Sequence, residues 1–175
     1  YICVFKSLRR PQFISHLRTE IFQAKKFLKS FISSLKERSN TAQTVNACVS
    51  CGADSPAQIL SAFILKMAHA QAAISRYGVP FEPLHVLVLS KCNDILGTLE
   101  NCVTDVSNGL STSAPSCKRF NAELIALVNL IDESIRHLFV SRSTVEYLKE
   151  REILLLIKKS LQVLENIIPN LDFEI

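Results

Sequence analysis

The stretch ISHLRTEIFQAKKFLKSFISSL, residues 14–35, decides the fold class of this chain. Its apolar residues recur at alternating steps of three and four, which places them on one stripe of an α-helix and which no β-strand would produce. The stripe consists of Ile14, Leu17, Ile21, Ala24, Leu28, Phe31 and Leu35. We therefore predict a long helix that buries this stripe against other helices.

Four later segments repeat the same alternation. Their stripes begin at Leu60, Val88, Phe120 and Tyr147. The last stripe is broken once, by Glu150. Each segment is long enough for several helical turns, so the chain is expected to be all-α.

Residues that start or stop helices mark the ends of these segments. We predict helices over 11–38, 56–78, 83–108, 116–140 and 143–168. Ser116 is expected to cap the fourth helix, and Ser143 with Glu146 has the spacing of a capping box for the fifth. Pro169 is expected to end the fifth helix.

Long helices with short connections between the last four predict antiparallel neighbours. The fold class is therefore an up-and-down bundle of five long helices, with a short helix or loop near 42–51. An α-solenoid of helix pairs is the alternative, although the helix starts do not follow one period. Gly97, inside the third helix, is interpreted as a point where a neighbouring helix approaches closely.

The 175 residues, of which 48% are hydrophobic, suit a single domain over 1–175 with a substantial core. Residues 1–10 are expected to be a weakly ordered or docking segment. The first residue is not Met and the last is apolar, so we expect a piece of a larger protein. No apolar run approaches the roughly 18 residues of a membrane-spanning helix, so no span is predicted.

The six cysteines leave the redox compartment open at first, because an even count is typical of disulfide frameworks. Cys92 and Cys102 lie on one apolar stripe ~15 Å apart, too far to pair with each other, and are interpreted as buried thiols. Cys117 stands alone in the sequence. Because free thiols are ordinary core residues and no Asn-x-Ser/Thr sequence occurs, we expect an intracellular protein, cytoplasmic or nuclear. The Cys48–Cys51 pair could be reduced, bridged or metal-bound.

The sequence contains no arrangement that names a reaction. There is a single Cys-x-x-Cys pair, and the four histidines fall singly on four predicted helices. Glu133 and His137 lack the second copy that a di-iron bundle would need. We predict no enzyme activity, no metal and no cofactor.

The first helix carries a basic stripe a quarter turn from its apolar stripe. Its members, Arg18, Lys25, Lys29 and Lys36, are spaced by 7, 4 and 7. Such a stripe could bind an acidic partner or a nucleic acid. The alternative is a solvated face that keeps the domain in solution.

Two segments have more apolar residues than one stripe requires. Leu155 and Leu156 point well away from the stripe of the last helix, and Val86 and Leu87 raise the same question in the third helix. Either these residues are buried in the centre of the bundle or a partner covers them. They are the candidate partner-binding residues.

These features favour a non-enzymatic scaffold or adaptor module of a larger intracellular protein. Its partner would be another protein, bound through an apolar helix face. A secreted helical-bundle ligand of the cytokine type is one alternative. A basic, nucleic-acid-binding helical domain is the other.

Overall fold

The structure, a computed structural model, describes residues 10–36, 55–78 and 83–174. These residues form five long helices and one short one. The helices are α2 (Arg10–Lys36), α3 (Pro56–Tyr77), α4 (Pro83–Ser107), α5 (Pro115–Ser141), α6 (Thr144–Leu164) and α7 (Ile167–Glu174). The predicted all-α bundle is confirmed, and the described ranges contain no strand. The segment expected at 1–10 lies outside these ranges except for Arg10, which begins α2. The segment expected at 42–51, with Cys48 and Cys51, lies outside them entirely.

The chain caps α3 and α6 with side chains from the preceding residue. Ser55 Oγ accepts a hydrogen bond from the backbone N–H of Gln58 at 3.2 Å, and Ser143 Oγ accepts one from Glu146 at 3.4 Å. Gly78 follows α3 at a φ of 62°, a left-handed conformation that costs glycine little. The capping role predicted for Ser143 is confirmed.

Two predicted helix ends are wrong. The residue before α5 is Ala114, so Ser116 does not cap the helix; its hydroxyl instead donates to Asp105 Oδ2 at 2.6 Å. The last long helix ends at Leu164, and Pro169 lies in the first turn of α7. Proline is tolerated there because a first-turn N–H has no partner within the helix.

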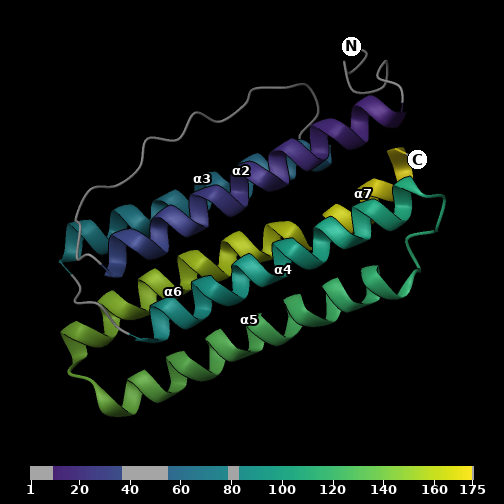
Figure 1. The fold of residues 1–175 in the computed structure, drawn as a ribbon. Helices are drawn as coiled ribbons and strands as arrows, with labels where there is room; N and C mark the ends of the chain where they lie inside the picture. The colour runs from purple at the N-terminus through teal and green to yellow at the C-terminus, as the bar shows by residue number, and fades with distance from the viewer. Residues whose placement is uncertain (1–9, 37–54, 79–82, 175) are drawn as a thin grey trace.

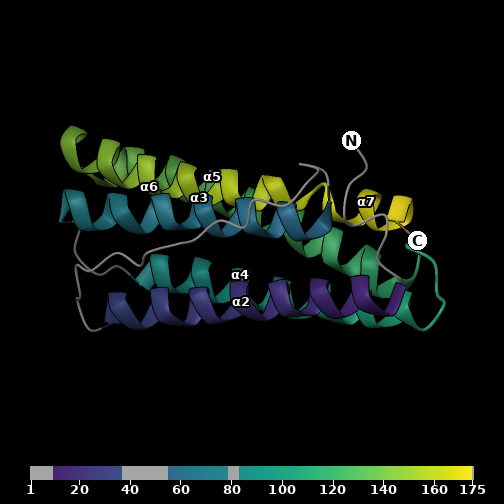
Figure 2. The same ribbon diagram turned by 90° about the horizontal axis from the view of Figure 1, so that it is seen from above.

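The five long helices form a closed ring in the order α2–α3–α6–α5–α4 (Figures 1 and 2). From α3 to α6 each helix runs antiparallel to the one before it, as predicted. The first two helices are instead parallel. Gln71, near the end of α3, donates a hydrogen bond to Ser34, near the end of α2, at 3.5 Å, so the two helices end side by side. A closed ring of neighbouring helices is not an α-solenoid, so that alternative does not apply.

The predicted stripes fill the centre of the ring. Every member of the first stripe is buried, and the largest fully buried side chains are Phe31, Phe63 and Phe120, from α2, α3 and α5. Burial of such side chains contributes about 1.5–3 kcal/mol each. The apolar core therefore supplies the main drive for the helices to assemble.

Gly97 does not mark a close approach of helices. A Cβ atom built there would meet nothing within 4 Å outside the backbone of its own helix. The interpretation drawn from the sequence is therefore wrong at this position. The glycine weakens α4 without a packing reason.

A disulfide joins α4 to α5. Cys102 and Cys117 are bonded, with Cα atoms 5.1 Å apart, and both residues are fully buried. The prediction of a buried, unpaired thiol is therefore wrong for Cys102, whereas Cys92 is a free, buried thiol as predicted. The bond fixes the α4–α5 hairpin near the turn that connects the two helices.

One described helix, α3, is long and apolar enough to meet the length and composition criteria for crossing a membrane. Of the segment that meets them, 56% is buried inside the bundle. That burial is typical of a core helix.

Candidate functional site

The four predicted partner-binding residues are mostly covered. Helix α6 packs between α3 and α5, and Leu156 lies against the core. Leu155 and Val86 are half-buried. Of the four, Leu87 is the most open, at 46% exposed. The central position considered for the last helix accounts for most of its additional apolar residues.

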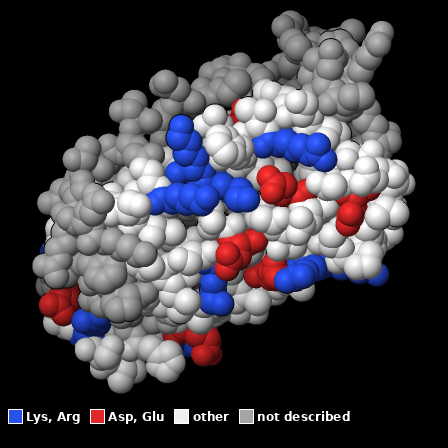
Figure 3. All heavy atoms as spheres, viewed as in Figure 1, with Lys and Arg blue, Asp and Glu red and all other residues white. Residues whose placement is uncertain are grey.

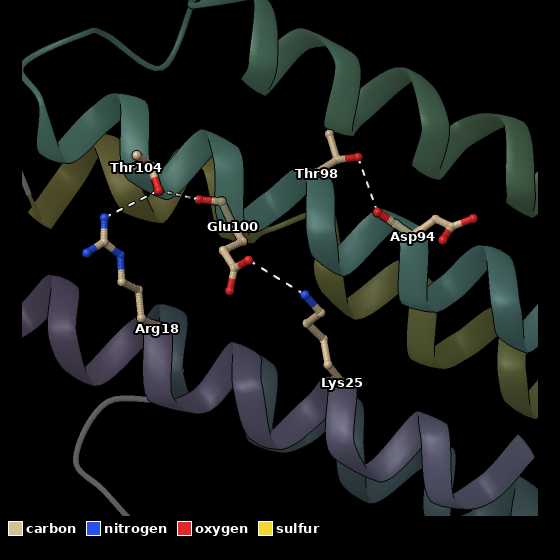
Figure 4. A network of polar contacts seen from close by, with 6 residues as sticks. All are labelled: Arg18, Lys25, Asp94, Thr98, Glu100 and Thr104. Atoms are coloured by element: carbon tan, nitrogen blue, oxygen red, sulfur yellow. Dashed lines mark hydrogen bonds and ion pairs between the residues drawn. The ribbon is translucent and has the colours of Figure 1, made fainter. Parts of the chain in front are cut away.

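Half of the predicted basic stripe faces α4 (Figure 4). Lys25 Nζ lies 3.6 Å from Glu100 Oε1, and Arg18 donates to the hydroxyl of Thr104 at 3.3 Å. Lys29 is exposed, and the side chain of Lys36 lies outside the described residues. Figure 3 shows acidic side chains beside basic ones on this face, so its charge is mixed.

Four of the exposed large apolar side chains in the described residues, including the three most exposed, lie instead at the turn between α5 and α6. Phe139 is 69% exposed, Val140 84%, Val145 63% and Leu148 53%. We call these four residues the apolar tip. The Phe139 ring makes an edge-to-face contact with Tyr147 of α6, with centroids 5.3 Å apart. Figure 1 shows this turn at the end of the bundle opposite the marked chain ends.

Sequence reasoning missed the apolar tip. The predicted stripe of the fourth helix ended at Leu138, and the two apolar residues that follow it lie off that stripe. Two more, Val145 and Leu148, come within five residues of the Ser143 cap. Large apolar residues out of register on both sides of a turn were the signal that could have revealed it.

A buried charged cluster lies behind the tip. His85 is fully buried at the start of α4, and its Nε2 atom lies 3.5 Å from Oε2 of Glu150 on α6. The other oxygen of Glu150 lies 3.5 Å from Nη2 of Arg142, the residue that follows α5. The Glu150 carboxyl thus connects the beginnings of α4 and α6 with the end of α5.

The surroundings of Glu150 keep its carboxyl ionised. Hydrogen bonding by His85 lowers its pKa most, burial opposes that effect, and the charges of His85 and Arg142 lower the pKa further. The net result is a pKa below the ordinary value of 4.5. At neutral pH the cluster therefore contains a carboxylate between two basic side chains.

A second polar group ties α3 to α6 at the same end. The Tyr77 hydroxyl donates to Glu152 Oε2, and Arg76 Nη2 lies 3.6 Å from the other oxygen of that carboxylate. The Arg76 guanidinium also lies over the Tyr77 ring, 4.7 Å from its centroid. The ends of four helices are therefore connected around the turn.

A shallow groove runs between α4 and α5. It has a volume of about 200 Å³, an apolar floor that includes Ile95 and Leu127, and charged walls that include Lys91, Asp94 and Glu123. Glu123 already accepts a hydrogen bond from Thr98 at 2.6 Å. The groove is smaller than the roughly 300–1,000 Å³ of a typical small-molecule pocket.

Within 10–36, 55–78 and 83–174, no group of three or more His, Cys, Asp or Glu side chains is placed to hold a metal ion. The His85–Glu150–Arg142 cluster offers one imidazole and one carboxylate that already contact each other. Its arrangement suits a structural role at the turn.

Comparisons with protein-family models, with curated proteins and with solved structures found no match to this chain.

Proposed function

We propose that this chain is a non-enzymatic helical ligand that acts outside the reducing cytosol by binding another protein. Of the two protein-binding roles that the sequence left open, this is the secreted, cytokine-type one. The observation that carries the choice is the Cys102–Cys117 disulfide.

The disulfide indicates the compartment in which the protein acts. Disulfides persist in oxidising environments and are rare in cytosolic and nuclear proteins, where thiols are kept reduced. Both cysteines are fully buried in the contact between α4 and α5. A buried bond between two helices of the core suits a structural cross-link, and it means that Cys102 is not one of the free thiols that favoured an intracellular setting.

Helix directions give independent support. A simple up-and-down bundle alternates at every step, whereas α2 and α3 run in the same direction. Parallel consecutive helices occur in bundles with a long crossover connection, and the secreted cytokines are one such class. The ferritin-like bundles are another, and they carry sets of Glu and His ligands from facing helices. The interior described here is lined mainly by Leu, Ile, Val, Phe and Ala.

The surface supports a binding role. Large apolar side chains are exposed at the apolar tip, where they leave apolar area in contact with water. Exposed apolar patches of this kind mark interaction surfaces in soluble proteins. Acidic and basic side chains are mixed on the face that Figure 3 shows, which does not favour a nucleic acid over a protein partner.

The test is saturable binding of the labelled, oxidised protein to intact cells of the source organism. The proposal predicts a plateau, competition by unlabelled protein, and loss of binding after brief treatment of the cells with protease. Non-saturable adsorption, or binding found only inside permeabilised cells, would contradict it. The second result would favour the intracellular adaptor instead.

A further inference from the structure

We infer that the linker between α4 and α5, residues 108–114, is a modification site that carries an O-linked sugar on Ser111, Thr112 or Ser113. The substrate class is a nucleotide sugar, from which a glycosyltransferase moves the sugar to a side-chain hydroxyl. This inference rests on the proposed function, because a secreted protein meets such transferases on its way out of the cell.

The composition of the linker is the first observation. Residues 111–113 are the only run of three consecutive Ser or Thr residues in the sequence, and Pro115 follows closely. Segments rich in Ser and Thr with proline are the compositional class that carries O-linked sugars. Because no Asn-x-Ser/Thr sequence occurs, these hydroxyls are the available kind of acceptor in this chain.

The backbone keeps the hydroxyl run outside the helices. Ser111 and Ser113 are exposed, and Thr112 is half-buried. Pro115 begins α5, and a residue before proline is restricted to extended conformations; Ala114 accordingly has a φ of −58° and a ψ of 152°. The run therefore stays in an exposed loop, where an enzyme can reach it.

The hydroxyls of the run do not cap a helix. Ser111 Oγ and Ser113 Oγ lie 2.6 Å apart and hydrogen-bond to each other, and Ser111 Oγ also accepts from the backbone N–H of Ser113 at 3.3 Å. Within the described ranges, the Thr112 hydroxyl makes no hydrogen bond. The cap position of α5 is occupied by Ala114, whose side chain makes no capping bond.

Hydroxyls at other turns have a structural use. Ser143 caps α6, Ser141 donates to the carbonyl of His137 at 3.0 Å, and Ser116 donates to Asp105. Such local hydrogen bonds are the ordinary reason for Ser and Thr at helix ends. The run at 111–113 lacks that reason.

The position of the linker suits a bulky group. The Cys102–Cys117 disulfide joins the two helices on either side of it, so the linker stays anchored at both ends. Figure 1 shows the linker at the end of the bundle opposite the turn between α5 and α6. A sugar attached to the linker leaves that turn open for a protein partner.

Phosphate is the other modification that these hydroxyls could accept. The start of α5 favours negative charge, but the end of α4 and the carboxylate of Asp105 oppose it. Asp105 contacts both sides of the run, through the backbone N–H of Leu110 at 3.0 Å and the hydroxyl of Ser116 at 2.6 Å. A neutral sugar avoids this repulsion and matches the secretory setting.

The transfer needs only the nucleotide sugar. The anomeric carbon forms a bond to the hydroxyl oxygen, and its bond to the diphosphate oxygen breaks. The nucleoside diphosphate leaves, and the hydroxyl proton passes to a base of the transferase. Nothing is oxidised or reduced.

The experiment is mass spectrometry of protein isolated from its source with free thiols blocked and then cleaved before Asp. Fragment 105–131 contains the run, and fragment 132–171 contains the hydroxyls of the turn between α5 and α6. After reduction, fragment 105–131 should be heavier by hexose or N-acetylhexosamine units. Alkaline β-elimination should remove this addition and phosphatase should not, while fragment 132–171 should have its unmodified mass.

Matched variants secreted from the same cells locate the sugar. The triple variant Ser111→Ala, Thr112→Val and Ser113→Ala should lose the whole addition. Ser141→Ala, the control, removes an exposed hydroxyl from the other turn and should keep it. Sugar found only on Ser107 or Ser116, or retained in full by the triple variant, would contradict the assignment.

The same sample separates the two proposals. An unmodified fragment 105–131 with Cys102 and Cys117 still bonded would show that the inference is wrong while the proposed function stands. An addition that phosphatase removes would overturn the inference in favour of phosphate. Blocking groups on both cysteines would contradict the proposed function, and the inference would fail with it.

Discussion

Replacing both Cys102 and Cys117 with alanine is expected to lower the free energy of unfolding by about 5 kcal/mol. The bond joins residues 15 apart in sequence, and a cross-link of that span restricts the unfolded chain by about 3 kcal/mol. Loss of each buried sulfur removes about another 1 kcal/mol of apolar burial and packing. The cross-link therefore accounts for the larger part of the predicted loss.

Cys92→Ala is the matched control, because Cys92 lies on the same helix, is 1% exposed and forms no disulfide. It reports the loss of a buried sulfur alone, about 1 kcal/mol. The free energy of unfolding is expected to fall by about 2 kcal/mol per molar urea. The midpoint of unfolding should therefore lie about 2.5 M lower for the double variant than for the wild type, and about 0.5 M lower for the control. The assay is urea denaturation without reductant, followed by circular dichroism. A double variant that loses no more than twice the control would refute the reasoning.

Four further outcomes are expected. Because the pKa of Glu150 is lowered in the folded protein, its stabilising contribution is present above about pH 4.5 and lost as the pH falls below it. Glu150→Gln leaves His85 and Arg142 without their carboxylate and should cost about 3–5 kcal/mol at pH 7. The stability of this variant should fall less steeply than that of the wild type in urea titrations from pH 5 to 3, and parallel curves would contradict this. Burial raises the pKa of the Cys92 thiol, so iodoacetamide at pH 8 should modify it only after denaturation. Mass spectrometry measures the labelling, and modification of Cys92 in the folded protein would contradict this prediction. Gly97→Ala should stabilise the protein by about 1 kcal/mol, and a lower melting temperature would mean that the site is tighter than described. Lys25→Glu breaks a partly exposed pair with Glu100 and should cost less than about 1 kcal/mol; a larger loss in thermal melts would show that the α2–α4 contact depends on it.

The helices could be predicted from the sequence because their signals are local. The apolar stripe of residues 14–35 is set by the 3.6-residue repeat of the helix, and all seven of its members are buried as predicted. The Ser143 cap needs only the residues that follow it. The positions of the helices and of their buried residues follow from such short-range rules.

The features that sequence reasoning missed depend on contacts between helices. Cys102 was considered against Cys92 on its own helix, whereas its partner, Cys117, comes from the next one. The parallel direction of α2 and α3 depends on where α3 starts in space, which no periodicity encodes. In the sequence, Glu150 only interrupts an apolar stripe. The structure shows that its carboxylate contacts His85, which comes from another helix.

The candidate surface shows the same limit. Leu155 and Leu156 were chosen because they lie off their own stripe, but a helix between two neighbours buries more than one stripe. The apolar tip lies at a helix end, where fewer neighbours are available to cover it. Exposure in a bundle depends on the number of packed neighbours as well as on the helical face.

The most direct test of the account is the state of Cys102 and Cys117 in protein isolated from its source with free thiols blocked at once. Protease cleavage before Asp94, Asp105 and Asp132 releases fragments 94–104 and 105–131, which contain one of these cysteines each. Mass spectrometry without reductant should find the two fragments joined, and separate after reduction. Two separate fragments, each carrying the blocking group, would contradict an oxidised, secreted ligand.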